Sequence, residues 1–334
     1  MAGNRLSALL QNVRRSIRRH DLLPPGSSVL VGLSGGSDSV ALTLVLSDLA
    51  EHGGFRLAAL AHFNHQIRAG AATDEAFCRA FAARRNLPIA VDTADVPAFA
   101  ASQGLSLEDA ARRVRYDFLR RAAAHAGATV VAVGHTRDDQ AETVLLKLAR
   151  GAGLAGVGGV YPRRDEVIRP LLDVSRAELR AFVTSRGELW VEDETNADLT
   201  NPRNRIRHRV LPELQAAYGG SPTGSLARAA ALAREDADCL DRQANDRYSG
   251  LCIDSGQALA FEVSALNAEP AAIRRRVLLR ALRSLSSGRE VGFDHVETAL
   301  EVASGQSGAA DLPGTRVELR GGKLVLIQQD ARSK

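Results

Sequence analysis

The sequence has little cysteine, few aromatic residues and no long apolar run. Its three cysteines, Cys78, Cys239 and Cys252, are scattered and form no CxxC pair, so we expect neither a disulfide framework nor a cysteine metal site. No apolar stretch approaches the roughly 18–20 residues that a membrane-spanning helix needs. The N-terminal stretch lacks the apolar core of a signal peptide. We therefore expect a soluble, cytoplasmic protein with no membrane partner.

What the sequence does contain is arginine in clusters. Its 334 residues are 45% hydrophobic, enough for two domains, and carry a net charge of +4. For each arginine cluster alone, a solvated helix face is the more ordinary explanation. The three together favour a polyanionic partner such as a nucleic acid. They are Arg14, Arg15, Arg18 and Arg19; Arg203, Arg205, Arg207 and Arg209; and Arg274, Arg275, Arg276, Arg280 and Arg283.

Short β-branched runs alternate with helical patterns over most of the chain, which predicts an α/β fold with a parallel sheet covered by helices on both faces. Strands are expected at 28–33, 56–63, 87–93 and 129–134, with a further candidate at 188–193. Helices are expected at 37–52, 73–86, 106–126, 137–150 and 175–186.

The alternation stops after about residue 215. Beyond it we expect helices at 225–248, 269–285 and 293–304, and a hairpin over 315–327 that turns at Gly321-Gly322. This pattern predicts an α/β domain over residues 1–215. A helical linker and a smaller α+β domain are then expected over residues 216–330.

The first predicted strand runs into a glycine- and serine-rich turn and then a helix, which indicates a phosphate site. Backbone N–H groups at a helix N-terminus bind anions, and glycines let the backbone close on an oxyanion. Asp38 is unusual beside phosphates unless a divalent cation lies between them. The alternative is an ordinary turn in which Asp38 only complements the helix dipole. The turn comprises Ser34, Gly35, Gly36, Ser37, Asp38 and Ser39.

A second polar cluster follows the strand at 129–134, in GHTRDDQAET. His135, Asp138, Asp139 and Glu142 crowd the first turns of a predicted helix. Acidic residues often occupy a first turn because of the helix dipole, but a histidine with three acids at the carboxyl end of a strand favours a functional site. The chemistry open to them is Mg²⁺ binding, proton transfer or recognition of a cationic substrate.

Two further stretches are candidates for the same site. His62, Asn64, His65 and Arg68 follow the second strand, and a structural role is the alternative for each histidine. We expect His62 to line the nucleotide site. Arg112, Arg115 and Tyr116 lie near one face of the helix at 106–126, where an arginine can neutralise nucleotide or RNA charge; an exposed, salt-bridged helix is the alternative.

The motif SGGSDS resembles the PP-loop of the N-type ATP pyrophosphatases. The full order of motifs, SGGSDS, HFNHQIR, LEDAARRVRY, GHTRDDQAET, RGAGLAGVGG, IRPLL and DETNADLTNPRNRIRHRVLP, resembles tRNA(Ile)-lysidine synthetases. The resemblance is dense over residues of about 25–215 and concerns only layout beyond 220. It implies a PP-loop fold in which ATP adenylates the C2 oxygen of the first anticodon cytidine of an isoleucine tRNA with a CAU anticodon. Free L-lysine then displaces AMP to give lysidine.

The resemblance also implies roles for particular residues. Ser34–Ser39 would hold ATP, with Asp38 near Mg²⁺. His135, Asp139 and Glu142 would lie at the reaction centre, and Arg115 would balance charge. The tRNA would lie near Arg203, Asn204 and Arg207.

The late arginine cluster is interpreted from helical spacing alone. Arg276, Arg280 and Arg283 share the helix face opposite an apolar stripe, so we expect this face to contact tRNA phosphates. The stripe comprises Val277, Leu278, Ala281, Leu282 and Leu285.

Two other functions and one assembly remain open at this stage. A PP-loop tRNA thiolase also adenylates a tRNA base, but such enzymes generally carry paired CxxC motifs. A non-catalytic ATP-binding regulator should have lost the acids at 138–142, which this chain keeps. A homodimer is left open as well.

Overall fold

The computed structural model describes residues 2–64, 70–192, 197–256 and 258–329. The chain forms two compact units, Met1–Arg234 and Glu235–Lys334, which we call the first and second unit. Within the described ranges, no helix is both long and apolar enough to cross a membrane. The predicted site residues His65 and Arg68 lie outside these ranges.

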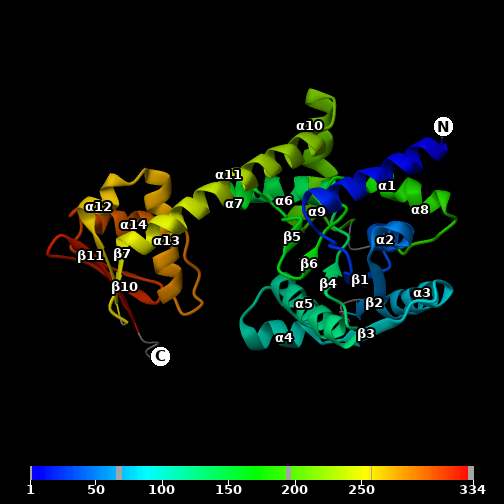
Figure 1. Ribbon diagram of the computed structural model, residues 1–334, viewed down its shortest axis with the longest axis horizontal. Coiled ribbons are helices and arrows are strands. Elements are labelled where there is room, and N and C mark those ends of the chain that lie inside the picture. Colours follow the sequence, from blue (N-terminus) through cyan, green and yellow to red (C-terminus); the bar gives the residue numbers. More distant parts are fainter. Residues whose placement is uncertain (1, 65–69, 193–196, 257, 330–334) are drawn as a thin grey trace. The chain divides into compact units, whose positions relative to one another are not determined.

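The first unit is built on a six-stranded sheet in the order β3-β2-β1-β4-β6-β5 (Figure 1). All neighbouring strands are parallel except β5 and β6. The parallel sheet predicted from the sequence is therefore confirmed. The strands are β1 Ser28–Gly32, β2 Arg56–Asn64, β3 Ile89–Thr93, β4 Val130–Ala132, β5 Arg163–Arg164 and β6 Val167–Ile168.

Helices cover both faces of this sheet because its strands are apolar on both sides. In β1, Val29 and Val31 pack on one face and Leu30 on the other. The first face is covered by α1 Ala2–Arg19, α2 Ser37–Gly53, α3 Ala71–Arg84 and α8 Arg176–Ser185. The second face is covered by α4 Val96–Gln103 and α5 Leu107–His125.

The strand order has one switch point, between β1 and β4. From β1 the chain moves outward through β2 to β3, and then returns to the other side of β1 to form β4. Open α/β sheets bind ligands at the carboxyl ends of strands beside such a point. The loop after β1 and the helix after β4, α6 Arg137–Ala149, both begin there.

The strand expected at 188–193 is wrong over its described residues, 188–192, which form no strand. The place beside β4 is taken by β6 instead. The Val191 amide donates to the Gly35 carbonyl at 2.9 Å, so the segment runs past the glycine turn instead of pairing with the sheet. Its apolar residues are explained by that packing, since Trp190 lies against the core.

The second unit begins inside a long helix, 19 residues after the boundary at 215/216 expected from the sequence. The boundary lies later in the chain because α10 and the start of α11 pack against the rest of the first unit. Leu226 lies against a small cluster that contains Ala141 and Leu211, and Arg234 donates to the Gly158 carbonyl at 2.6 Å. The connecting elements are α7 Leu154–Val157, α9 Pro202–Arg205, a π-helical turn Ile206–Val210, α10 Leu211–Tyr218 and α11 Pro222–Leu251.

The second unit has an antiparallel sheet in the order β7-β8-β11-β10-β9, with helices on it. The expected hairpin is confirmed: Arg320 pairs with Lys323, and both Gly321 and Gly322 have positive φ, as a two-residue hairpin turn requires. The elements are β7 Cys252–Asp254, β8 Ala258–Glu262, α12 Val263–Ala268, α13 Ala271–Leu285, α14 Phe293–Ala303, β9 Ala309–Leu312, β10 Thr315–Arg320 and β11 Lys323–Gln328. The apolar stripe predicted for α13 lies in the core of this unit, with Leu285 partly buried.

Gly134, just after β4, allows the two site segments to approach. A Cβ atom there would lie 3.1 Å from the carbonyl carbon and oxygen of Asp38 and 3.2 Å from the Ser39 amide nitrogen. These are backbone atoms at the start of α2, so they cannot rotate away.

We expect Gly134→Ala to lower the free energy of unfolding by about 1–3 kcal/mol, the usual cost of overpacking. Gly153→Ala is the matched control, because its Cβ would meet no atom within 4 Å. Thermal and urea unfolding of both variants measure the difference. Equal stability of the two would show that the close approach carries no constraint.

Candidate active site

Serine side chains form hydrogen bonds within the loop after β1 and fix its backbone. Ser39 Oγ accepts from the Ser34 amide at 3.1 Å and donates to the Gly36 carbonyl at 3.0 Å. Gly35 has a φ of 89°, which L side chains rarely adopt. Among the described residues, no side chain caps the N-terminus of α2, which leaves this helix end suited to an anion.

His62, at the end of β2, is buried beside this loop. Its Nδ1–H donates to the Leu33 carbonyl at 2.9 Å, which fixes the ring. Its Nε2 is buried and has no hydrogen-bond partner in the described part of the chain. The ring therefore presents one unused polar atom next to the start of the loop.

The acids of the second cluster are fixed by the start of α6. The Thr136 and Asp139 side chains form a capping box, in which Asp139 Oδ2 accepts from the Thr136 amide at 2.8 Å and its hydroxyl at 2.7 Å. Glu142 lies one turn further along the helix and is fully buried. One oxygen of Asp139 and both oxygens of Glu142 remain for other partners.

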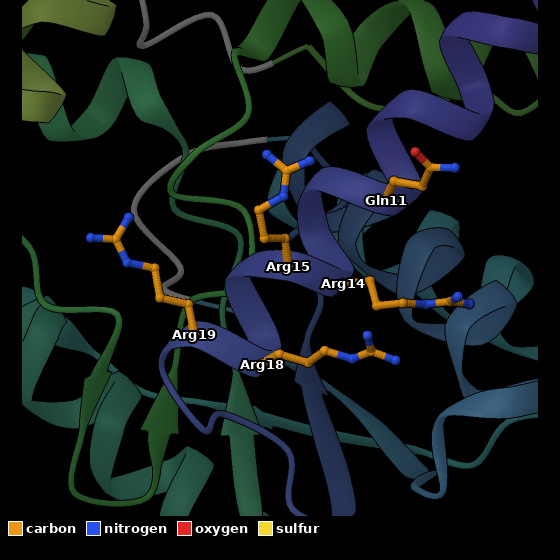
Figure 2. A pocket seen from close by; sticks show the side chains of 5 residues that line it. All are labelled: Gln11, Arg14, Arg15, Arg18 and Arg19. Carbon is orange, nitrogen blue, oxygen red and sulfur yellow. The ribbon is translucent and has the colours of Figure 1, made fainter.

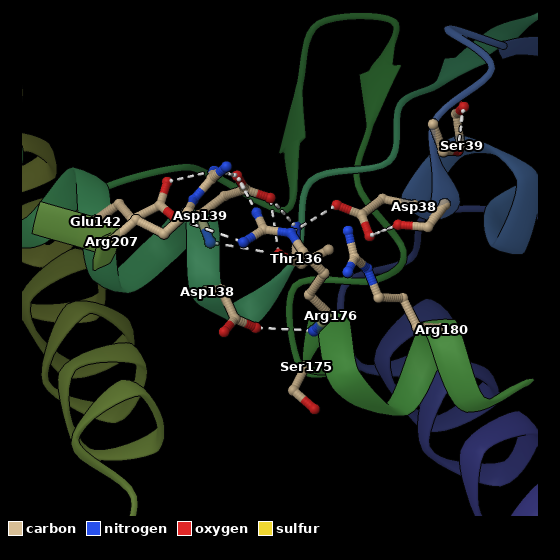
Figure 3. A network of polar contacts seen from close by, with 12 residues as sticks. Asp38, Ser39, Thr136, Asp138, Asp139, Glu142, Ser175, Arg176, Arg180 and Arg207 are labelled. Carbon is tan, nitrogen blue, oxygen red and sulfur yellow. Dashed lines mark hydrogen bonds and ion pairs between the residues drawn. The ribbon is translucent and has the colours of Figure 1, made fainter. Parts of the chain in front are cut away.

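The first partner of these acids is Arg176, the residue at which α8 begins (Figure 3). Its Nε donates to Asp38 Oδ2 at 3.1 Å and its Nη2 to Asp139 Oδ1 at 3.1 Å, while Nη1 lies 3.6 Å from Glu142 Oε1. Its backbone amide donates to Asp138 Oδ2 at 2.8 Å. A single arginine therefore joins the phosphate loop to the acids of α6.

Two further arginines complete the network. Arg203 Nε donates to Glu142 Oε2 at 2.7 Å and its Nη2 to Asp139 Oδ1 at 3.0 Å. Arg207 Nε donates to Glu142 Oε1 at 2.7 Å. The two arginines are four residues apart along α9 and the π-helical turn, so both reach the same buried carboxylate.

These contacts set the ionisation of the acids. Burial raises the pKa of Asp38, and the nearby Arg176 opposes the rise only in part. Burial also acts to raise the pKa of Asp139, but the charges of Arg176 and Arg203 outweigh it and hold the value at about 2. Asp139 is thus a stable anion, whereas Asp38 is the acid whose proton affinity is increased.

A second set of side chains, made of arginines, lies near His135. Burial lowers the pKa of His135 to about 3, with smaller contributions from Arg169, Arg115 and Arg203, so the ring is neutral near pH 7. Its Nδ1 is buried without a hydrogen-bond partner in the described ranges. Arg169 is itself buried and donates to the Tyr161 carbonyl at 2.9 Å.

Burial lowers the pKa of Arg115 as well. Its guanidinium carbon lies 5.4 Å from the ring centre of Tyr116. Arg115 is thus a desolvated cation that contributes to the charge around His135. Positive charge held away from water acts strongly on an anion brought beside it.

The structure brings most of the predicted residues together. The serine-glycine loop, His62, His135, Asp139 and Glu142 lie around the switch point, and the early part of the Arg203 cluster joins them. Arg203 and Arg207, predicted to contact tRNA, bind the acids of α6 in this structure. Asn204 is buried and its side chain donates to the Asp198 carbonyl at 2.9 Å.

Two predicted residues lie elsewhere, in the second unit. Arg276 Nε donates to Asp241 Oδ1 at 2.7 Å. Arg280 donates to Asn245 Oδ1 at 2.6 Å, and its guanidinium lies 4.2 Å from the ring centre of Tyr248. Their role as tRNA contacts stays a prediction.

Arg176 and Arg169 are the site residues that sequence reasoning missed. The signal for Arg176 was present: Ser175 and Glu178 form a capping box that marks a helix start, and Arg176 is the first residue inside it. Nothing in the sequence says that this helix start faces Asp38. Within the described residues, no group of three or more His, Cys, Asp or Glu side chains is arranged to hold a metal ion.

Comparison with known protein families gives two matches. The PP-loop domain family matches residues 6–214, and the TilS substrate binding domain family matches residues 261–325. Among solved structures, a U34-tRNA thiolase from Methanococcus maripaludis, determined with its 4Fe–4S cluster, aligns with a TM-score of 0.56 at 17% identity. That alignment covers 69% of this chain and 80% of the thiolase. A likeness at this identity shows a shared fold and nothing about activity.

Curated relatives are similar over most of this chain. A tRNA(Ile)-lysidine synthase from Geobacter sulfurreducens is 38% identical over 92% of this chain and 66% of its own length. One from Symbiobacterium thermophilum is 39% identical over 94% of this chain and 68% of its own. One from Thermus thermophilus is 40% identical over 79% of this chain and 50% of its own. The chain thus spans between half and about two thirds of these relatives' lengths. It belongs to the tRNA(Ile)-lysidine synthase family, whose PP-loop domain carries the site described above.

Proposed function

We propose that this protein ligates lysine to C2 of the first anticodon cytidine of an isoleucine tRNA with a CAU anticodon. In the first step the C2 oxygen attacks the α-phosphorus of ATP, and the bond to the β-phosphate breaks to release pyrophosphate. In the second step the ε-amine of lysine attacks C2, AMP leaves with the oxygen, and the amine loses a proton. The observation that carries the proposal is a phosphate loop joined to buried acids at the switch point of the sheet.

The loop of Ser34–Ser39 suits the ATP phosphates. Its helix N-terminus has no capping side chain among the described residues, and a phosphate group can take that place. The unused Nε2 of His62 can accept a hydrogen bond from the nucleotide. The buried Arg169 and the half-buried Arg115 are suited to negative charge that develops during adenylation.

Asp38 fits a magnesium ion as one ligand among several. Mg²⁺ is commonly held by one or two carboxylates together with substrate phosphates, so three protein ligands are not required. When bound, the ion neutralises phosphate charge and assists the departure of pyrophosphate. Arg176 shares the Asp38 carboxylate and already balances its charge.

The acids of α6 suit the ammonium group of lysine. In this structure, Asp139 and Glu142 are fully engaged by Arg176, Arg203 and Arg207. A lysine ammonium can reach them only by exchanging with one of these arginines. Arg203 has the most exposed side chain of the three, 31%. Its displacement by lysine therefore disturbs less of the buried structure than displacement of either other arginine would. The released guanidinium is then available to the tRNA.

The remaining parts of the proposal rest on the family and on charge. The second unit would take part in tRNA binding through Arg276 and Arg280, with Asn204 holding the loop that carries Arg203. A cytoplasmic site of action follows from a tRNA substrate. A homodimer is compatible with this function and is not required by it.

The direct test is to incubate the protein with ATP, labelled lysine and bulk bacterial tRNA. We expect label in tRNA, only in species with a CAU anticodon, and one pyrophosphate released per lysine attached. Sulfur incorporation instead of lysine would favour a thiolase. ATP binding without pyrophosphate release, in the presence of tRNA, would favour a regulator.

Asp38→Asn tests the loop acid. We expect the variant to fold and to lose roughly 10²–10³ in turnover, the usual cost of removing one charge-stabilising contact. Asp48→Asn, on the same helix but in a surface pair with Arg186, is the matched control and should keep activity. Pyrophosphate release measures both. Near-normal release by the folded Asp38 variant would remove this residue from the chemistry.

Arg176→Gln tests the link between the loop and the acids. Arg176 lowers the pKa of Asp38, so its loss raises that pKa further. If ionised Asp38 is the active form, activity on the acidic side of the pH–rate profile is lost at higher pH than in the wild type. Arg176→Lys, which keeps the charge, should restore the profile in part.

The control for this experiment is Arg180→Gln, one turn along α8 and paired at the surface with Glu192. A uniform loss of rate in Arg176→Gln, with an unmoved acidic limb, would mean that Arg176 only supports the fold.

A further inference from the structure

The function proposed above leaves the first arginine cluster unexplained. Gln11, Arg14, Arg15, Arg18 and Arg19 line one pocket on α1, which we call the α1 basic face. Figure 2 shows their side chains extending from the helix, with Arg14 and Arg18 on the same side. All four arginines are exposed.

The apolar side of α1 packs into the protein and so keeps the α1 basic face at the surface. Leu9, Val13 and Ile17 recur at four-residue spacing, are buried, and pack into the core of the first unit. The helix is therefore held in place by its apolar side, and its arginines cannot turn inward. The apolar side is also unavailable to a lipid bilayer, which an interfacial helix would have to enter.

Most of the charge on this face is not balanced by acids of the protein. The sequence of α1 contains no aspartate or glutamate. Within the described ranges, no ion pair joins Arg14, Arg15 or Arg18 to a carboxylate. Like charges four residues apart, such as Arg14 and Arg18, repel each other by about 0.2–0.5 kcal/mol. Elsewhere in this unit, exposed arginines such as Arg79 and Arg121 are paired with acids.

The α1 basic face belongs to a helix that contacts the segment leading into the active site. Asn12 Nδ2 donates to the Asp173 carbonyl at 3.3 Å, and Arg137 Nη1 from the start of α6 donates to the same carbonyl at 3.4 Å. Asp173 lies three residues before Arg176, which binds Asp38 and Asp139. The helix that carries the α1 basic face is therefore joined to the segment that leads into Arg176.

We propose that the α1 basic face binds the phosphate backbone of the substrate tRNA. The inference rests on the proposed function for the identity of the RNA. Phosphate is the ligand, and not an unpaired base, because α1 carries no aromatic residue or histidine on which a base could stack. Arginine guanidinium groups bind phosphate oxygens through paired hydrogen bonds. Such contacts position an RNA without reading its sequence.

The test compares two triple variants with the same change in net charge. Arg14, Arg15 and Arg18 are changed to Gln in one variant. The paired surface arginines Arg79, Arg120 and Arg121 are changed to Gln in the control. Dissociation constants for tRNA are measured over a salt series, together with thermal unfolding and lysidine formation at saturating tRNA.

We expect the α1 variant to bind tRNAs of any anticodon more weakly and by the same factor. The slope of log affinity against log salt should flatten by about 0.7–0.9 for each phosphate that the variant no longer binds. Turnover at saturating tRNA should stay at the wild-type value, as should the melting temperature. The control variant should keep the wild-type salt slope.

The outcomes separate this inference from the proposed function. If the wild type makes no lysidine but the α1 variant still loses tRNA affinity and slope, the function fails and the phosphate surface stands. If the wild type makes lysidine and the α1 variant matches the control, the inference is overturned. It is also overturned if only binding to phosphatidylglycerol-containing vesicles, and not to tRNA, depends on the three arginines.

Discussion

The buried charge of Glu142 is the constraint on which the site depends. A carboxylate with no exposed surface is tolerated only when it is paired and hydrogen-bonded, and removing a partner from such a group usually costs several kcal/mol. Its partners, Arg203, Arg207 and the slightly more distant Arg176, come from segments 34 to 65 residues further along the chain. Tertiary structure, and not the local helix, therefore decides whether α6 can carry these acids.

The same constraint links the two halves of the site. Arg176 can reach Asp38, Asp139 and Glu142 together only because β1 and β4 are neighbours and Gly134 lets the following segments approach. The three acids share the guanidinium of Arg176. A change in the charge of one acid therefore alters the electrostatic potential at the other two. The opposite directions of the pKa shifts of Asp38 and Asp139 are a consequence, since Asp139 has a second arginine and Asp38 does not.

Sequence reasoning finds what local patterns encode. The strands, most of the helices, the glycine turn and the acids of α6 follow from periodicity, capping and residue chemistry at strand ends. It misses Arg176 because nothing local reports which helix start faces the loop. It places a strand at 188–193 because an apolar run that packs beside a loop has the same composition as a short strand. The family resemblance places Arg203 and Arg207 near tRNA, which stays a prediction, but it does not reveal their pairing with Glu142 in this structure.

The choice of arginine for these partners bears on the reaction proposed. Arginine stays charged at any ordinary pH and can fork between two carboxylates, whereas a lysine ammonium is a single, more strongly hydrated charge. A bound lysine thus cannot replace Arg176, which spans Asp38, Asp139 and Glu142, whereas Arg203 spans only Asp139 and Glu142, which Arg176 and Arg207 continue to pair when Arg203 is displaced. That asymmetry leaves the loop and the acids aligned while one cation exchanges for another. The position that a substrate amine would occupy is therefore fixed by the arginines that remain.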